Sequence, residues 1–187
     1  MKLLLGLMFM LLGVSRFYAI PVKDNYMSTY QDSAKTFIPE KTSLSSFNVL
    51  TVADTAFKVE DIGRLLGKGY GELFTYIDKH KLKAGKVMAF YNTPQLPFVF
   101  DAAVEVNRLP VGLTGKIKGK KIKGGDAVVV HYQGPYDQIG AAYAAITKWL
   151  KENNKKGVAQ PFEVYLNDPV TVKDPQQLRT DVYQRIQ

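Results

Sequence analysis

Few side chains in this chain are suited to metal or nucleophilic chemistry. The sequence contains no cysteine and only two histidines, His80 and His131. The absence of cysteine excludes thiol catalysis and a disulfide scaffold. The two histidines do not form a metal-ligand pair, because one ends a predicted helix and the other lies in a predicted strand. No glycine-rich segment has the spacing of a nucleotide-binding loop, so we expect neither a metal nor a cofactor.

Basic side chains are concentrated in one short segment of a chain whose formal net charge is +8. The segment contains Lys116, Lys118, Lys120, Lys121 and Lys123. One interpretation is a contact for anionic lipid, polysaccharide or nucleic acid. The other is a solvated loop or an edge strand whose lysines discourage the addition of another strand. We favour the second interpretation, because no arginine or aromatic residue is interleaved to stack on bases.

The N-terminal residues predict export. Met1 and Lys2 precede an apolar run over residues 3–14, which is the pattern of a secretory signal. The run is too short to span a bilayer comfortably, so we expect cleavage after Ala19 or, without cleavage, an N-terminal anchor. Residues 20–47 are rich in polar and turn-forming types and predict a lead or linker. The expected location is periplasmic or secreted, and membrane-anchored if residues 1–19 are retained.

The elements that must position any site are predicted by an internal repeat. Residues 66–80 and residues 139–153 share one pattern of apolar, glycine and aromatic positions at a constant offset of 73. Each segment carries an apolar stripe at helical spacing, formed by Leu66, Tyr70, Leu73 and Ile77 in the first and by Ile139, Tyr143, Ile146 and Leu150 in the second. Both segments therefore predict amphipathic helices.

Short β-type runs flank each predicted helix. The first unit, residues 48–106, has candidate strands at 49–59, 87–91 and 98–106, and the second unit, residues 125–187, has them at 127–132, 162–166 and 178–186. The pattern predicts one α+β domain over residues 48–187, made of duplicated β-α-β-β units. Because one unit alone leaves a sheet face and a helix stripe uncovered, we expect the two units to join. The joined antiparallel sheet would have pseudo-twofold symmetry, two helices and an inter-repeat cleft, the natural place for a ligand.

Three segments of the second unit carry a family resemblance. They are His-Tyr-Gln-Gly-Pro-Tyr at 131–136, Phe-Glu-Val-Tyr-Leu-Asn-Asp-Pro at 162–169, and Leu-Arg-Thr-Asp-Val-Tyr at 178–183. Together with the helix between them they resemble the GyrI-like small-molecule-binding domain, a duplicated β-α-β-β family related to SOUL-like proteins. The family includes effector-binding domains of AraC-type and MerR-type multidrug regulators and the gyrase-inhibitor proteins. The resemblance is clearest over residues 125–187, and the first repeat fits the same architecture.

The resemblance implies a cleft that binds lipophilic and often cationic compounds. Glu163 matches the acidic residue of the family, and the equivalent position of the first repeat is Ala89, so one half of the cleft would be charged. A carboxylate among aromatic rings offers a cation a counter-charge and π faces. The candidate ring residues are Tyr132, Tyr136, Tyr143, Trp149 and Tyr165 from the second repeat and Phe90 and Tyr91 from the first. The strand residues cannot be assigned to a face without a register, and Tyr143 also suits a core position.

Three functions stay open at this level. The favoured one is an exported small-molecule-binding protein. A second is a hydrolase, since some GyrI-like proteins hydrolyse reactive small molecules; Glu163 would be the general base and Tyr165, Tyr132 or Tyr136 a proton donor. A third is an envelope protein that docks through the lysine run. No helix-turn-helix pattern precedes residue 48, so we expect no nucleic-acid partner, and export argues against gyrase inhibition.

Overall fold

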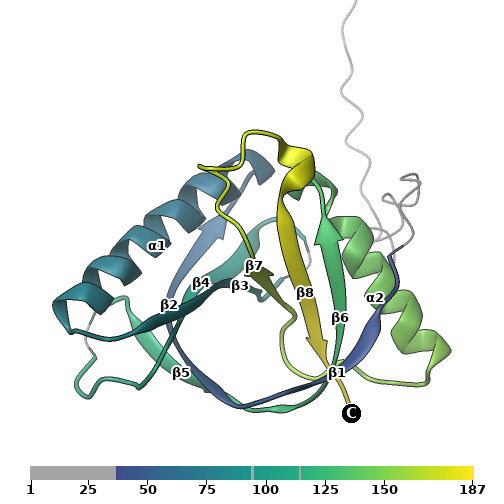
Figure 1. Ribbon diagram of the computed structural model, residues 1–187, viewed down its shortest axis with the longest axis horizontal. Helices are drawn as coiled ribbons and strands as arrows, with labels where there is room; N and C mark the ends of the chain where they lie inside the picture. Colours follow the sequence, from purple (N-terminus) through teal and green to yellow (C-terminus); the bar gives the residue numbers. More distant parts are fainter. Residues whose placement is uncertain (1–36, 94, 114) are drawn as a thin grey trace, which may run out of the picture.

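The computed structural model describes residues 37–93, 95–113 and 115–187 (Figure 1). The predicted signal over residues 1–19 and the part of the predicted lead before residue 37 lie outside the described residues. Within the described ranges, none of the helices combines the length and apolar character needed to cross a bilayer.

Both predicted β-α-β-β units are confirmed. The first contains β2 (Phe47–Ala56), a 3-10 turn η1 (Val59–Asp61), α1 (Ile62–Lys79), β3 (Ala84–Tyr91) and β4 (Phe98–Val106). The second contains β6 (Gly125–Gln133), the turn η2 (Tyr136–Gln138), α2 (Gly140–Glu152), β7 (Phe162–Tyr165), the turn η3 (Pro175–Gln177) and β8 (Arg179–Arg185). α1 contains several glycines, which have low helix propensity, but its regular apolar stripe still predicts the helix. Leu66, Leu73 and Ile77 of that stripe are buried.

Two further strands exchange between the halves. β1 (Glu40–Leu44) directly precedes β2 but pairs with β6, and β5 (Lys118–Ile122) directly precedes β6 but pairs with β2. The eight strands form one antiparallel sheet in the order β1-β6-β8-β7-β3-β4-β2-β5, which curls round so that its two edges approach the same end of the molecule (Figure 1).

β1 differs from the sequence expectation, and β5 agrees with it. β1 lies inside the stretch predicted as a polar lead, because its Glu-Lys-Thr-Ser-Leu sequence has no apolar alternation. The lysine run forms the edge strand β5, and Lys120 Nζ lies 2.7 Å from Asp101 Oδ2. Lysines on an edge strand oppose the addition of another strand. Docking of this segment on an anionic surface was the less favoured alternative, and nothing in the structure tests it.

The pseudo-twofold axis passes between β3 and β7 at the centre of the sheet. Ala89 pairs directly with Glu163, the position equivalent to it in the second repeat, while Met88 pairs with Val164 and Phe90 with Phe162. The halves on either side have matching strand orders, β3-β4-β2-β5 and β7-β8-β6-β1. Equivalent residues of the two repeats therefore meet at the axis.

Both helices cover the same face of the sheet. α1 packs on β2 and β4, and α2 packs on β6 and β8, one on each side of the centre (Figure 1). Gly69 allows a close approach of α1 to the sheet, since a Cβ at this position would lie 2.7 Å from Ala102 Cβ. The centre of this face, over β3 and β7, is left for the cavity described below.

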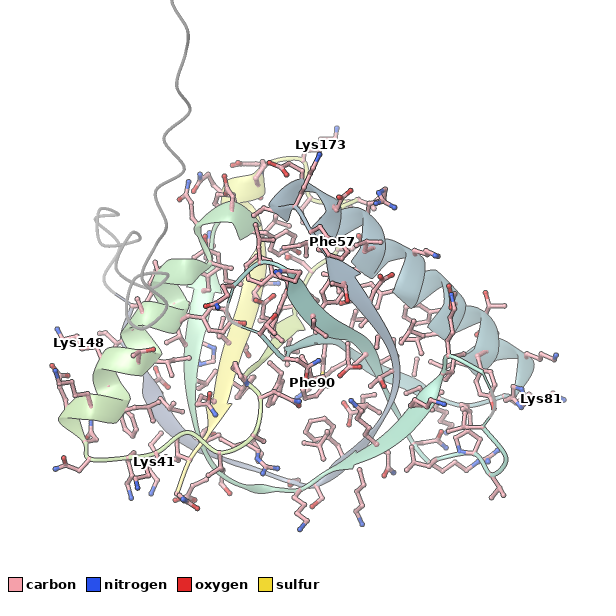
Figure 2. The ribbon with its side chains drawn as sticks, turned by 180° about the vertical axis from the view of Figure 1, so that it is seen from behind. Lys41, Phe57, Lys81, Phe90, Lys148 and Lys173 are labelled. Carbon is pink, nitrogen blue, oxygen red and sulfur yellow. The ribbon has the colours of Figure 1, made fainter. Side chains whose placement is uncertain are left out.

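A separate apolar cluster covers the other face. Phe90 and Phe162 stack with their ring centroids 5.1 Å apart, and Tyr183 stacks on Phe162 at the same distance. The other buried residues of this cluster are Val49, Met88, Ala103 and Val164. Phe90 lies in the space that the curled sheet encloses, on the side away from the helices (Figure 2).

Candidate functional site

A cavity of about 1600 Å³ opens between the two helices, above the central strands β3 and β7. Its size exceeds the usual range of about 300–1,000 Å³ for small-molecule sites. Side chains of both repeats line the cavity. The cavity therefore corresponds to the inter-repeat cleft that the duplication predicts. The lining residues used below are Glu60, Gly63, Gly67, Tyr70, Phe74, Tyr91, Phe98, Tyr136, Asp137, Gly140, Tyr143, Glu163, Tyr165 and Asp168.

Glu163 lies at the centre of the cavity floor and is only 3% exposed. Its two carboxylate oxygens each accept a hydrogen bond: Tyr143 Oη donates to Oε1 at 2.8 Å and Tyr165 Oη donates to Oε2 at 2.6 Å. Burial raises the pKa of Glu163 from 4.5 to about 7, and the two hydrogen bonds, which stabilise the ionised form, partly oppose that rise. The carboxylate therefore changes charge near neutral pH.

Tyrosines surround the carboxylate. The Tyr165 ring meets the Tyr136 ring edge-on at 5.6 Å and the Tyr70 ring at 6.4 Å. Tyr70 Oη donates to the backbone oxygen of Met88 at 2.9 Å. Burial and then the charge of Glu163 hold the pKa values of Tyr70 and Tyr165 well above 10. These hydroxyls thus stay protonated and act as donors.

A tight turn between β6 and α2 positions Tyr136. Gly134 has a φ of +150°, and a Cβ there would lie 2.8 Å from Tyr132 Oη, so this position requires glycine. Tyr132 Oη donates to the backbone oxygen of Pro135 at 2.6 Å. The turn is therefore tied down directly before Tyr136 enters the cavity wall.

The lining of the cavity is acidic although the chain is basic. It contains four carboxylates, those of Glu60, Asp137, Glu163 and Asp168. Among the described residues that line it there is no lysine, arginine or histidine, in a chain with 25 lysines and arginines against 17 acidic residues. The electrostatic field inside the cavity therefore favours positive charge.

The structure brings together five of the eight residues predicted to bind a ligand. Tyr91, Tyr136, Tyr143, Glu163 and Tyr165 all line the cavity. Glu163 and Tyr165 share one face of β7 because successive strand residues alternate. The sequence thus locates the acidic residue and its tyrosine shell.

The other three predicted residues are not in the cavity wall, and their placement there is corrected. Phe90 points to the opposite face of the sheet, because Ala89 and Tyr91 take the helix side. The Tyr132 ring packs in the core of the second repeat. Trp149 follows Tyr143 by six positions, and at about 100° per residue it projects elsewhere from α2, onto the same core.

Several cavity residues were not predicted. Tyr70 and Phe74 come from α1 and Phe98 from β4, and the exposed acids Glu60, Asp137 and Asp168 also line the cavity. The repeat contained a signal for Tyr70, since it occupies the position of Tyr143. The acids lie in short turns and loops, where sequence alone does not indicate whether a side chain points toward the cavity.

The described residues contain no group of three or more histidine, cysteine, aspartate or glutamate side chains arranged to hold a metal ion. His131 Nδ1 instead lies 2.6 Å from Asp181 Oδ1 on the neighbouring strand.

Known structures share this fold. EcmrR in its DNA complex aligns with a TM-score of 0.71 and 16% identity over 81% of this chain, and the chain spans 57% of that EcmrR chain. A hydrolase from Listeria innocua aligns with a TM-score of 0.57 and 13% identity, over 80% of this chain and 91% of its own. SAV2435 bound to tetraphenylphosphonium aligns with a TM-score of 0.52 and 11% identity, over 80% and 94%. At these identities the likeness shows the fold alone.

A family model gives the assignment that the structural likeness cannot. No curated protein matches the chain. The model of the GyrI-like small-molecule-binding domain matches residues 43–187, which include both repeats and the whole cavity. The chain therefore belongs to the family of GyrI-like small-molecule-binding domains.

Proposed function

We propose that the cavity binds a lipophilic organic cation. The observation that carries the proposal is the charge of the lining: four carboxylates and, among the described residues, no basic side chain. Glu163 supplies a buried counter-charge, and the tyrosine and phenylalanine rings supply apolar contact and π faces. An anion entering the same site would lose its hydration without gaining a positive partner.

The protonation of Glu163 adds a constraint to this proposal. With a pKa of about 7, the empty site holds a mixture of neutral and ionised carboxyl at neutral pH. A bound cation favours the ionised form, so its affinity rises as the carboxyl deprotonates. In the unliganded protein, burying a neutral carboxyl costs less free energy than burying an ionised one. SAV2435, which shares the fold, has been solved with tetraphenylphosphonium, a lipophilic cation.

Two probes of equal shape and opposite charge test the proposal. Tetraphenylphosphonium and tetraphenylborate are titrated by calorimetry against the wild type and Glu163→Gln. We expect the wild type to prefer the cation, and the substitution to weaken cation binding about tenfold or more, because a desolvated charge pair is lost. Tetraphenylborate should bind no more weakly to the variant than to the wild type.

Glu105→Gln is the matched control, because Glu105 lies in β4 outside the lining of this cavity. Its cation affinity should equal that of the wild type. Equal binding of both probes to the wild type, or equal cation affinity in the wild type and Glu163→Gln, would remove the carboxylate from the proposed role.

A hydrolase is the second candidate, and one observation favours it. A carboxyl with a pKa of about 7, buried beside tyrosine rings, has the basicity of a general base at neutral pH. A fold neighbour is named a hydrolase. Turnover of ester or strained-ring probes that disappears in Glu163→Gln would support this function, whereas wild-type rates equal to the uncatalysed background would reject it.

The location of the protein is proposed from residues 1–19 alone. Fractionation of expressing cells, with N-terminal sequencing of the product, distinguishes a cleaved exported protein from an anchored one. A product that keeps Met1 and fractionates with the cytoplasm would refute export.

A further inference from the structure

The wall that α1 contributes to the cavity contains two glycines near the start of the helix. Gly63 and Gly67 are one turn apart, and both line the cavity. A Cβ at either position would meet no atom within 4 Å. No close contact therefore requires glycine there, although glycine lowers helix stability by about 1 kcal/mol relative to alanine. What the two glycines do is leave open space in the cavity wall, beside the bare backbone of α1.

The second repeat has an aromatic ring at the equivalent place. The offset of 73 between the helices makes Gly67 equivalent to Gly140 and Gly63 equivalent to Tyr136. Tyr136 lines the cavity, and its ring meets the Tyr165 ring edge-on with the centroids 5.6 Å apart. The two walls of the cleft therefore differ by one whole ring at this place.

The floor of the first half has the matching aromatic residue. Tyr91 is the equivalent of Tyr165, since each follows the axis residue of its strand by two positions and lies on the same face. Tyr91 and Phe98 both line the cavity, and their rings meet edge-on at 6.4 Å. The pseudo-twofold symmetry relates Gly63 and Tyr91 as it relates Tyr136 and Tyr165. A ligand ring above Gly63 would thus meet Tyr91 in the edge-on geometry that aromatic pairs favour.

This place lies close to the buried carboxylate. Ala89 pairs directly with Glu163, and Tyr91 follows Ala89 by two residues along β3. At about 3.3 Å per residue, Tyr91 is displaced along the strand by about 7 Å from the partner of Glu163. A ring joined to a cationic atom through one carbon extends over a similar distance, so one ligand can reach both places.

We propose that Gly63 and Tyr91 form a subsite for an aromatic ring of the ligand. The inferred ligand class is a cation whose charged atom carries a benzyl or similar arylmethyl group. The ring lies against the bare backbone of α1 and takes the position that Tyr136 occupies in the second half. This inference rests on the proposed cation site and specifies the group that accompanies the charge.

Two cations of equal charge and similar size test the inference. One is benzyldodecyldimethylammonium, and the other is (cyclohexylmethyl)dodecyldimethylammonium, in which the ring is saturated. Dissociation constants are measured by competition with a fluorescent cation, below the micellar concentration of both probes. The wild type should bind the benzyl probe about three- to tenfold more tightly, the range of one aromatic pair. The saturated probe is the more lipophilic of the two, so lipophilicity alone would give the opposite order.

Gly63→Tyr gives the first half the ring that the second half has, and should fill the subsite. Because tyrosine is a better helix former than glycine, the variant should fold. We expect its preference for the benzyl probe to disappear. Gly71→Tyr is the matched control: Gly71 also lies in α1 with no atom within 4 Å of an added Cβ, but it is not among the described residues that line the cavity. Its affinities should equal those of the wild type.

Two outcomes would overturn the aromatic subsite. One is equal affinity of the wild type for both probes, and the other is a ratio of affinities that Gly63→Tyr leaves within about twofold of the wild-type ratio. The cation site itself fails separately, if neither probe binds the wild type or if Glu163→Gln leaves both affinities unchanged.

Discussion

The two halves of the cleft carry the same tyrosine at equivalent places in α1 and α2, but they use its hydroxyl differently. In the second half, Tyr143 donates to Glu163 at 2.8 Å. In the first half, Tyr70 donates to the backbone oxygen of Met88 at 2.9 Å. The first repeat has Ala89 where the second has Glu163, so Tyr70 has no carboxylate of its own repeat to bind. The duplicated repeats therefore share the wall tyrosine, but only the second repeat has the carboxylate.

The position of the axis explains why the charge is single. Ala89 and Glu163 are direct cross-strand partners, so identical acids there would be neighbours on one face of the sheet. Two buried carboxylates at that separation cannot both ionise without strong repulsion. A symmetric cleft with a charged floor is therefore disfavoured, and a single acid at the axis serves both halves.

Restoring the symmetry should produce the largest effect. Ala89→Glu adds a second carboxylate where Ala89 is 0% exposed. We expect the free energy of unfolding at pH 8 to fall by about 3–5 kcal/mol, the cost of an uncompensated buried charge. At pH 5 part of the loss should disappear, because the pair can hold a proton. Urea unfolding at the two pH values measures both quantities.

Two further variants separate charge from volume in this experiment. Ala89→Gln adds similar bulk without charge, so its loss of stability should not depend on pH. Ala89→Glu combined with Glu163→Ala moves the single carboxylate to the other half, and should be more stable at pH 8 than Ala89→Glu alone. An equal loss for Ala89→Glu at both pH values would show that crowding, and not repulsion, decides the asymmetry.

The charged half should also make stability depend on pH. Between pH 4.5 and about 7, the native state holds a proton on Glu163 that the unfolded state releases. The free energy of unfolding therefore falls as pH rises through this window, by about 3 kcal/mol for a shift of this size. Cation affinity should rise over the same window, because the carboxylate ionises. Urea unfolding and cation titration at several pH values measure the two opposite trends.

Glu163→Gln removes the titrating group, and its unfolding free energy should lose this component of the pH dependence. The first half contains no counterpart, since Ala89 does not titrate. A wild-type profile that coincides with that of Glu163→Gln from pH 4.5 to 8 would mean that Glu163 has an ordinary pKa and that the cavity is wetter than its burial indicates.

The sequence predicted the elements that form the walls of the cleft better than it predicted which strand side chains point into the cavity. The apolar stripes that contain Tyr70 and Tyr143 recur with the repeat, so both helices and the cleft between them follow from periodicity. Whether Phe90 or Tyr91 faces the cavity depends on strand register, which pairs residues distant in sequence. β1 escaped prediction because a short polar edge strand depends on its partner strand for stability, and its own side chains carry no pattern.

The equivalent tyrosines should differ in their influence on Glu163. Tyr143→Phe removes a hydrogen bond to the ionised carboxylate, so the pKa of Glu163 should rise further, by about one unit. Tyr70→Phe removes a bond to a backbone oxygen and should leave that pKa within about 0.3 unit, a difference well under 1 kcal/mol. Carbon-13 NMR titration of labelled glutamate, assigned with Glu163→Gln, measures both. Equal pKa values in the two variants would mean that the halves are electrostatically alike.

The smallest expected effect concerns a feature that the halves share. Gly67 and Gly140 occupy equivalent positions, and both line the cavity. A Cβ at Gly67 would meet no atom within 4 Å, so Gly67→Ala should stabilise α1 by up to about 1 kcal/mol. Gly69→Ala is the control of opposite sign, since its Cβ would lie 2.7 Å from Ala102 Cβ, and urea unfolding compares the two variants. If Gly67→Ala stabilises the protein but weakens binding of tetraphenylphosphonium, glycine at this position leaves space for the ligand at the expense of helix stability. If its affinity stays at the wild-type value, the space beside Gly67 lies outside the occupied part of the cavity.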